Sequence, residues 1–242
     1  MTPMTCLIPS RMESTRFPGK ALATIKQWPM VIHCAKNSIE AGLETWVCTD
    51  NNLIQDACDQ EKINVVMTPH FDTGTDRCSW AAKELRSKKL IVLQGDEPLI
   101  NSRMLQKFMR VVESINNENC LVNGLNPISP HGDHDPNTVK AYCNKDNHIY
   151  GLTRRPSSAQ QTSLVSFQSG PYRQLGLYGG LLSSFEAFKS LTRSPLETTE
   201  NIEMLRWIFH GKQLLAAQLN GALLSVDTPA DLKNVQNLFS ND

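Results

Sequence analysis

The sequence predicts an α/β fold in which a mostly parallel sheet carries helices on both faces. Up to about residue 125, short apolar runs alternate with longer stretches that have the apolar period of a helix. This alternation is typical of strand–helix–strand units, whose strands pair in parallel. Ligands of such sheets bind beyond the carboxyl ends of the strands, so functional residues are expected directly after each predicted strand.

The first strand is expected over Thr5–Pro9, and a helix is expected to begin with Pro29 and to end before Gly42. Proline is favoured at the first position of a helix, and glycine is favoured just beyond its end. The same reasoning gives the other elements of this part, namely strands over Thr45–Thr49, Val65–Met67, Leu90–Leu93 and Leu121–Leu125, and helices over Asn51–Glu61, Asp76–Arg86 and Ser102–Ile115.

The later part of the chain is less regular. A hairpin is expected around the turn residues Asn144, Asp146 and Asn147, and residues 154–172, rich in Ser, Gln and Pro, predict a loop. The last helix is expected to have Thr228 as its N-cap and Pro229 at its first position. The remaining expected elements are hairpin strands over Val139–Tyr142 and His148–Thr153, strands over Gln174–Tyr178 and Ala222–Val226, and a mostly helical segment over Pro195–Gly211.

Composition excludes several classes of protein. The chain has 242 residues, with 24 Lys+Arg and 24 Asp+Glu, so it lacks the basic excess of proteins that bind nucleic acid or a membrane surface. Its 7 cysteines are scattered without a Cys-x-x-Cys pair, which indicates reduced thiols in a cytoplasmic protein. No apolar run approaches the roughly 18 residues of a membrane span, and no signal peptide is apparent.

A basic loop directly follows the first predicted strand. It contains three cations, Arg11, Arg16 and Lys20, and between them lie small residues that let backbone amides approach a ligand, namely Ser10, Ser14, Thr15 and Gly19. Two guanidinium groups and an ammonium on one loop suit a polyphosphate. The alternative is an ordinary basic surface loop, and the segment is not a Walker A loop.

Two aspartates follow predicted strands. Asp96 comes directly after Leu90–Leu93, and Asp227 comes after the strand expected over Ala222–Val226. Carboxylates at neighbouring strand ends could hold Mg²⁺ together with substrate phosphates, whereas the alternative for each is a cap or a surface turn. The segment 73–77, Thr-Gly-Thr-Asp-Arg, suits a ribose or a base, or is simply the start of a helix.

Seven short motifs along the chain point to one family. The chain resembles the 3-deoxy-manno-octulosonate cytidylyltransferases from about residue 5 to about residue 239. The motifs are I-P-S-R-x-x-S-T-R-F-P-G-K at 8–20, T-G-T-D-R at 73–77, L-Q-G-D-E-P at 93–98, P-N-T-V-K at 136–140, L-G-L-Y-G at 175–179, S-P-L-E at 194–197 and V-D-T-P-A-D-L at 226–232.

The resemblance implies a single nucleotidyltransferase-type domain over residues 1–242, with a β-rich excursion at about 126–180 that helps to form a homodimer. It implies transfer of CMP from CTP to the anomeric hydroxyl of a sugar acid, with Mg²⁺ as cofactor and pyrophosphate as the second product. The expected partners are therefore CTP and the sugar acid, and the expected pathway is lipopolysaccharide or capsule synthesis.

The resemblance also assigns roles to residues. Lys20, Asp96 and Asp227 would be catalytic, with Asp96 and Asp227 as the magnesium ligands. The nucleotide would be bound by two segments that include Ser10, Arg11, Arg16, Lys20, Thr73, Gly74 and Arg77. The sugar-acid pocket would include Gln94, Arg154, Gln174, Tyr178, Glu200 and Glu203.

The chain departs from the family pattern mainly where the sugar is expected to bind. Gln174 replaces a histidine, and Met204, an expected apolar wall of the pocket, replaces a glutamine. Residues 155–158 replace an Ile-Pro-Trp-like run, and Phe71-Asp72 lies where a histidine is usual. Three functions stay open: transfer to 3-deoxy-manno-octulosonate or an analogue such as its 8-amino form, transfer to another sugar acid or a phosphonate, and silent nucleotide binding.

Overall fold

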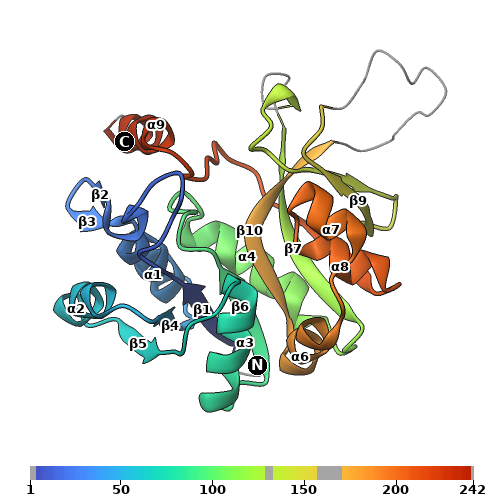
Figure 1. Cartoon of the computed structure of the whole chain (residues 1–242), viewed down its shortest axis with the longest axis horizontal. Helices are drawn as coiled ribbons and strands as arrows, with labels where there is room; N and C mark the ends of the chain where they lie inside the picture. Colours follow the sequence, from blue (N-terminus) through green and yellow to red (C-terminus); the bar gives the residue numbers. More distant parts are fainter. Residues whose placement is uncertain (1–3, 129–132, 157–170, 241–242) are drawn as a thin grey trace.

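The computed structural model describes residues 4–128, 133–156 and 171–240, and in these residues the main sheet has nine strands. Seven of them lie in the order β11-β7-β10-β6-β1-β4-β5 (Figure 1). These strands are β1 (Met4–Pro9), β4 (Glu44–Thr49), β5 (Asn64–Met67), β6 (Lys89–Leu93), β7 (Cys120–Pro127), β10 (Tyr172–Leu181) and β11 (Gln213–Gln218).

The sheet is mainly parallel, as expected from the sequence. β1 pairs in parallel with β4 and β6, and β4–β5 and β7–β11 are also parallel pairs. β10 alone of these seven runs antiparallel to both of its neighbours, β6 and β7. The hairpin β8 (Lys140–Cys143) and β9 (Ile149–Thr153) pairs with β10 through β8 and confirms the predicted excursion hairpin.

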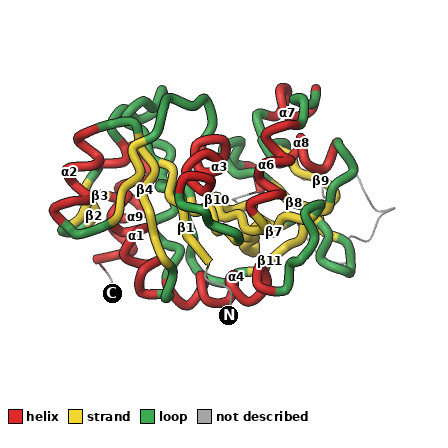
Figure 2. Tube along the Cα trace, turned by 90° about the horizontal axis from the view of Figure 1, so that it is seen from below, coloured by secondary structure: helices red, strands yellow, loops and turns green. Residues whose placement is uncertain are grey.

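Helices cover both faces of the sheet, because the central strand β1 has apolar side chains on both of its faces. Cys6 and Ile8 pack into one core cluster with α1 and α4, whereas Leu7 points to the other face and packs with α3, α6 and α8. Figure 2 shows α3 and α6 on one side of the strands and α4 on the other. The helices are α1 (Met30–Glu40), α2 (Asn52–Gln60), α3 (Gly74–Glu84), α4 (Ser102–Glu113), α6 (Leu182–Ser190), α7 (Pro195–Glu200), α8 (Met204–Phe209) and α9 (Pro229–Ser240).

The N-terminal loop and the last helix form a separate corner. A 3₁₀ turn, η1 (Lys20–Leu22), follows the basic loop, and the short strands β2 (Thr24–Ile25) and β3 (Trp28–Pro29) form a second small sheet. Ile25, Met30, Val226 and Val235 are buried together and attach α9 to this corner (Figure 1). The chain therefore returns at its C-terminal end to the loop that follows β1. None of the described helices has the length and apolar content needed to cross a membrane.

Two sequence predictions about elements are wrong, and at two other places the structure adds detail that the sequence did not reveal. The strand expected over Ala222–Val226 is absent, and the parallel neighbour of β7 is β11, whose polar ends Gln213 and Gln218 hid it. The segment Pro195–Gly211 is mostly helical, as expected, but it is divided into two helices, because Asn201 has a left-handed backbone with φ 52°. α6 was not predicted, and Pro29 is the N-cap of α1, one residue before its first turn. Most of the predicted loop at 154–172 lies outside the described residues.

A buried ion pair holds α7 against α8. The Arg206 guanidinium donates to both oxygens of Glu197, at 2.9 and 2.5 Å, and lies 4.5 Å from the centre of the Phe188 ring. The two side chains are only 5% and 8% exposed, so either charge would be costly without the other.

We therefore expect Arg206→Met to lower the free energy of unfolding by about 3–5 kcal/mol, since it leaves the Glu197 carboxylate buried with only Arg193 at 4.0 Å. Urea denaturation measures the loss. The double variant Glu197→Gln/Arg206→Met, which removes both charges, should lose clearly less. An equal or larger loss in the double variant would show that packing, and not the unpaired charge, causes the destabilisation.

Candidate active site

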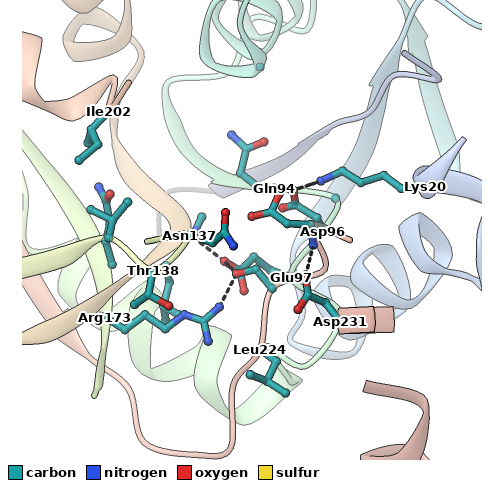
Figure 3. A pocket seen from close by; sticks show the side chains of 18 of the residues that line it. Lys20, Gln94, Asp96, Glu97, Asn137, Thr138, Arg173, Ile202, Leu224 and Asp231 are labelled. Atoms are coloured by element: carbon teal, nitrogen blue, oxygen red, sulfur yellow. Dashed lines mark hydrogen bonds and ion pairs between the residues drawn. The ribbon is translucent and has the colours of Figure 1, made fainter. Parts of the chain in front are cut away.

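A single large cavity gathers the residues that the sequence marked as functional. Its volume is about 1400 Å³, and it opens at the carboxyl ends of β1 and β6. One side is formed by the basic loop after β1 and by the segment that leads into α9, and the other side by β10 and the α7–α8 connection (Figure 3). The cavity thus lies where ligands of parallel α/β sheets bind.

The Lys20 ammonium lies at the centre of the charged side. Its Nζ is 2.5 Å from Asp96 Oδ2 (Figure 3). It also lies 3.6 Å from Asp227 Oδ1 and donates to the Val226 carbonyl at 3.1 Å. Burial disfavours the charged ammonium, but the carboxylates of Asp96 and then Asp227 outweigh it and raise the pKa of Lys20. The two predicted metal carboxylates are therefore neighbours, joined by the predicted phosphate-binding lysine.

Arg16 connects the basic loop to two other segments. One end of its guanidinium lies 2.9 Å from Asp227 Oδ1, and the other donates to Asn137 Oδ1 at 3.0 Å. Arg11 reaches only the Asp72 carbonyl, at 3.5 Å, and the buried Ser10 hydroxyl has no hydrogen-bond partner in the described residues. Sequence reasoning did not identify Asn137 as a functional residue, although it lies in the P-N-T-V-K motif.

Asp227 is held in place by the start of α9 rather than by a strand. Asp231 Oδ2 accepts hydrogen bonds from the backbone amides of Asp227 and Thr228, at 3.1 and 2.8 Å, and from the Thr228 hydroxyl. The Thr228 hydroxyl in turn accepts from the Asp231 amide at 3.3 Å, which confirms Thr228 as the N-cap. This reciprocal capping fixes the backbone beside Asp227. Asp231 was missed, although the Thr-x-x-Asp spacing of a capping box was visible.

The segment 73–77 lines the cavity beside Gln94. Thr73 caps α3 by accepting from the Asp76 amide at 3.1 Å, and a side chain on Gly74 would come within 3.2 Å of the Gln94 amide oxygen. Arg77 is only 2% exposed, and its guanidinium donates to Thr68 and, at 2.8 Å, to Asp50. The Arg77 side chain thus supports this wall from behind, and its predicted contact with the nucleotide stays a prediction.

On the opposite side, β6 and β10 approach closely at Gly176. The backbone amide of Gln94 donates to the Gly176 carbonyl at 2.7 Å, and the backbone amide of Gly176 donates to Glu97 Oε1 at 2.9 Å. A Cβ atom on Gly176 would lie 2.7 Å from Gln94 Cγ, so only glycine fits there. Burial raises the pKa of Glu97 despite the nearby Arg173 guanidinium. This contact places Gln94 at the border of the two halves of the cavity.

Arg154 and Glu200 form a brace at the edge of the cavity. Arg154 donates to the backbone carbonyls of Asn137, Glu200 and Asn201, at 3.0, 3.0 and 3.4 Å. Glu200 Oε2 accepts from the Arg154 amide at 2.8 Å, and Glu200 Oε1 lies 3.6 Å from Arg155. These contacts link the excursion to α7. They leave the guanidinium of Arg154 occupied by carbonyl oxygens.

Glu203 and Tyr178 line the deep end of this side. Glu203 Oε2 is buried and has no hydrogen-bond partner in the described residues. Burial, with Asp76 nearby, raises the pKa of Glu203. Burial also raises the pKa of Tyr178, with Glu203 as the strongest charged neighbour. A buried carboxyl group without a partner is a natural contact for a bound ligand.

The two replaced side chains occupy different environments. Gln174 lines the cavity, as expected, and so do Phe71 and Asp72. Met204 does not: its side chain is fully buried in the core cluster that contains Trp207 and Phe188. The expectation that Met204 forms an apolar wall of the pocket is therefore wrong. The break at Asn201 sets which side of α8 faces the core, and this was not visible in the sequence.

Comparison with known proteins agrees with this geometry. A family model described as "Cytidylyltransferase" matches residues 5–222. The 3-deoxy-manno-octulosonate cytidylyltransferase of Chlorobium chlorochromatii (strain CaD3) is 32% identical over 96% of this chain and 95% of its own. That of Neisseria gonorrhoeae (strain NCCP11945) is 32% identical over 99% of each chain. The chain belongs to the 3-deoxy-manno-octulosonate cytidylyltransferase family.

Solved structures extend this result. CMP:2-keto-3-deoxy-manno-octonic acid synthetase complexed with CTP superimposes with a TM-score of 0.86, is 27% identical and matches over 99% of each chain. An apo UDP-glucose pyrophosphorylase has a TM-score of 0.73 at 13% identity and shares the fold alone. The chain is thus an α/β nucleotidyltransferase with cytidylyltransferase activity.

The raised pKa of Glu203 predicts a pH-dependent loss of stability. Because the folded chain holds a proton on Glu203 more tightly than the unfolded chain does, this group costs stability as the pH rises through its raised folded pKa. Glu203→Gln lacks this cost, so its free energy of unfolding relative to the wild type should increase as the pH rises above about 4, the ordinary range of a glutamate carboxyl group. Urea denaturation at several pH values measures the difference, and a constant difference would contradict the burial of this carboxyl group.

Proposed function

We propose that the protein transfers CMP from CTP to the anomeric hydroxyl of 3-deoxy-manno-octulosonate or a close analogue, such as its 8-amino form, and releases pyrophosphate. The observation that most strongly supports this proposal is the contact of Lys20 with both Asp96 and Asp227, in a cavity that Arg16 also borders. The names of the relatives and the CTP complex of a solved neighbour support the choice of substrates.

The residues present fit Mg²⁺ as the cofactor. Asp96 and Asp227 offer carboxylate oxygens, the donors that Mg²⁺ prefers, and their side chains are 26% and 23% exposed to the cavity. Magnesium bound there would lower the charge of the triphosphate and acidify the attacking hydroxyl. Among the described residues, no group of three or more His, Cys, Asp or Glu side chains could hold a metal, so the remaining ligands would come from phosphate and water.

The chain's own residues position the two substrates. Lys20 and Arg16 would leave the carboxylates for the triphosphate, where their charge stabilises the departing pyrophosphate. Ser10 and Arg11 would bind the phosphates, and Thr73, Gly74 and Arg77 would form or support the wall against which the nucleoside rests. No protein nucleophile is required, because in-line transfer depends mainly on positioning and charge neutralisation.

The sugar acid would bind between Gln94 and the deep end of the cavity. The residues proposed for it are Gln94, Arg154, Gln174, Tyr178, Glu200 and Glu203, all of which line the cavity. The same chemistry on a different sugar acid or a phosphonate is the second candidate, favoured by Gln174 where the family pattern has histidine. A silent nucleotide-binding protein is disfavoured because both proposed metal carboxylates and all three loop cations are present, and Lys20 and Arg16 contact the carboxylates.

We further propose a cytoplasmic homodimer that serves lipopolysaccharide or capsule synthesis. The 7 cysteines are all buried as free thiols, which suits a reducing compartment. β9, α7 and α8 lie against one another and carry exposed apolar side chains, Tyr150, Leu196 and Phe209, which would be covered by a second copy. The dimer would therefore form through the excursion and the helices beside it.

The proposed function is tested by pyrophosphate release over a panel of nucleoside triphosphates and acid acceptors. CTP with 3-deoxy-manno-octulosonate, or with its 8-amino form, should give the highest kcat/KM. If another sugar acid or a phosphonate gave the highest kcat/KM, the proposed acceptor would be wrong, but the proposed reaction would stand. Absence of release with every pair, from a protein that still binds CTP by calorimetry, would contradict the proposal.

Substitution of either carboxylate should separate catalysis from folding. Asp96→Asn or Asp227→Asn removes a charge that Mg²⁺ needs, so pyrophosphate release should fall at least about a thousandfold, on the order of 4 kcal/mol, while the melting temperature stays near that of the wild type. Asp56→Asn, a change on the far helix α2, is the matched control. Retained activity with a lower melting temperature would instead indicate that the aspartate is only structural.

A further inference from the structure

A bulge in β10 shapes the sugar side of the cavity. Gln174 pairs with Leu125 and Tyr178 pairs with Asn123, so β10 advances four residues while β7 advances two. Within the bulge, the Gly176 carbonyl accepts from the backbone amide of Gln94, and three other backbone groups are paired with side chains instead of with β7. Asn123 Nδ2 donates to the carbonyls of Leu175 and Leu177, both at 3.0 Å, and Glu97 accepts from the Gly176 amide.

These carbonyls fix the orientation of the Asn123 side chain. Asn123 is fully buried, and its Nδ2 must face the two carbonyl oxygens, since an amide oxygen placed there would meet two acceptors and no donor. Its Oδ1 is therefore an acceptor, and it lies 2.8 Å from the Gln174 side-chain amide. Gln174 must then donate through Nε2, which directs its own Oε1 away from Asn123.

The oxygen of Gln174 is left for a ligand. Gln174 lines the cavity, and its Oε1 accepts no hydrogen bond from the residues that the structure describes. The nearby cations are already engaged: Arg154 donates to three backbone carbonyls, and Arg173 donates to the Leu223 carbonyl and the Ser225 hydroxyl at 2.6 and 2.8 Å. Glu203 Oε2, on the same cavity, is a second acceptor without a partner.

We infer that Gln174 is a specificity-determining residue that presents a hydrogen-bond acceptor to a hydroxyl or ammonium group of the acceptor sugar, and that Asn123 is the positioning residue that holds it so. This inference rests on the proposed cytidylyl transfer. A histidine at this position could donate or become cationic, whereas the oriented glutamine offers its oxygen. The acceptor's carboxylate is therefore bound elsewhere, and the part of the sugar at Gln174 must carry a donor.

The inference is tested with a set of acceptor analogues. The best acceptor from the pyrophosphate-release panel is compared with analogues in which one hydroxyl at a time is replaced by fluorine, which cannot donate, or by an amine, which can. A site built to pair with a donor rejects an analogue that lacks it. We expect one ring or side-chain position at which wild type loses at least about tenfold in kcat/KM with fluorine and keeps activity with the amine.

Gln174→Met should remove this discrimination, so that the fluorinated and parent acceptors differ by less than about twofold, while the KM for CTP is unchanged. Gln218→Met, on β11, is the matched control and should behave as the wild type. Asn123→Ser should also reduce the discrimination without changing the KM for CTP. Gln174→Glu has no N–H for Asn123 Oδ1 but keeps an acceptor oxygen, so it should keep the discrimination and tests the acceptor role should Asn123→Ser not fold.

Three outcomes would overturn the inference: wild type that tolerates fluorine at every position, discrimination that survives in Gln174→Met, and discrimination that survives in Asn123→Ser or is lost in Gln174→Glu. Discrimination between hydroxyl and amine at the sensitive position tells which donor the site prefers. Failure of the proposed function looks different, because wild type would then release pyrophosphate with none of the parent acceptors.

Discussion

The site depends on one interaction, the contact of the Lys20 ammonium with the carboxylates of Asp96 and Asp227. These residues come from three segments that are far apart in the chain: the loop after β1, the end of β6 and the segment that leads into α9. Together with Arg16 they form two cations and two anions, so their charges balance in the absence of a ligand. A divalent cation can take the two carboxylates and a triphosphate can take the two cations, so each ligand binds the groups that the other releases.

The opposite side of the cavity is built by different means. β10 runs against its neighbours and bulges, and buried side chains, Asn123 and Glu97, satisfy the backbone groups that the bulge exposes. The bulge carries Gln174 and Tyr178 to the cavity, and Gly176 lets β6 approach closely enough to place Gln94 between the two halves. Charge dominates one side, and hydrogen-bond direction dominates the other. The charged side is the proposed nucleotide side, which keeps the family pattern, and the other is the proposed sugar side, where the chain departs from it.

The sequence allowed the charged half to be predicted because each of its residues follows an apolar strand or lies just before the start of a helix. Asp227 lies beside Asp96 in the cavity, as expected, although the strand predicted before it does not exist. The capping interactions of Asp231 with the backbone of Asp227 and Thr228 hold it there instead. Asn123 could not be predicted: an amide in an apolar strand gives no sign of the bulge that it supports. Met204 was misplaced because the left-handed Asn201 resets the face of α8, and no local pattern reveals such a break.

The most direct test of the contact between Lys20 and the two carboxylates is to measure Mn²⁺ binding in the absence of nucleotide, with electron paramagnetic resonance as the readout. If Lys20 neutralises the metal carboxylates, Lys20→Met should bind Mn²⁺ at least about tenfold more tightly than the wild type, a difference of about 1.4 kcal/mol, and should bind CTP more weakly in calorimetry. Lys36→Met, which removes a surface ion pair with Glu61, controls for net charge. Equal Mn²⁺ affinity in wild type and Lys20→Met would contradict the account.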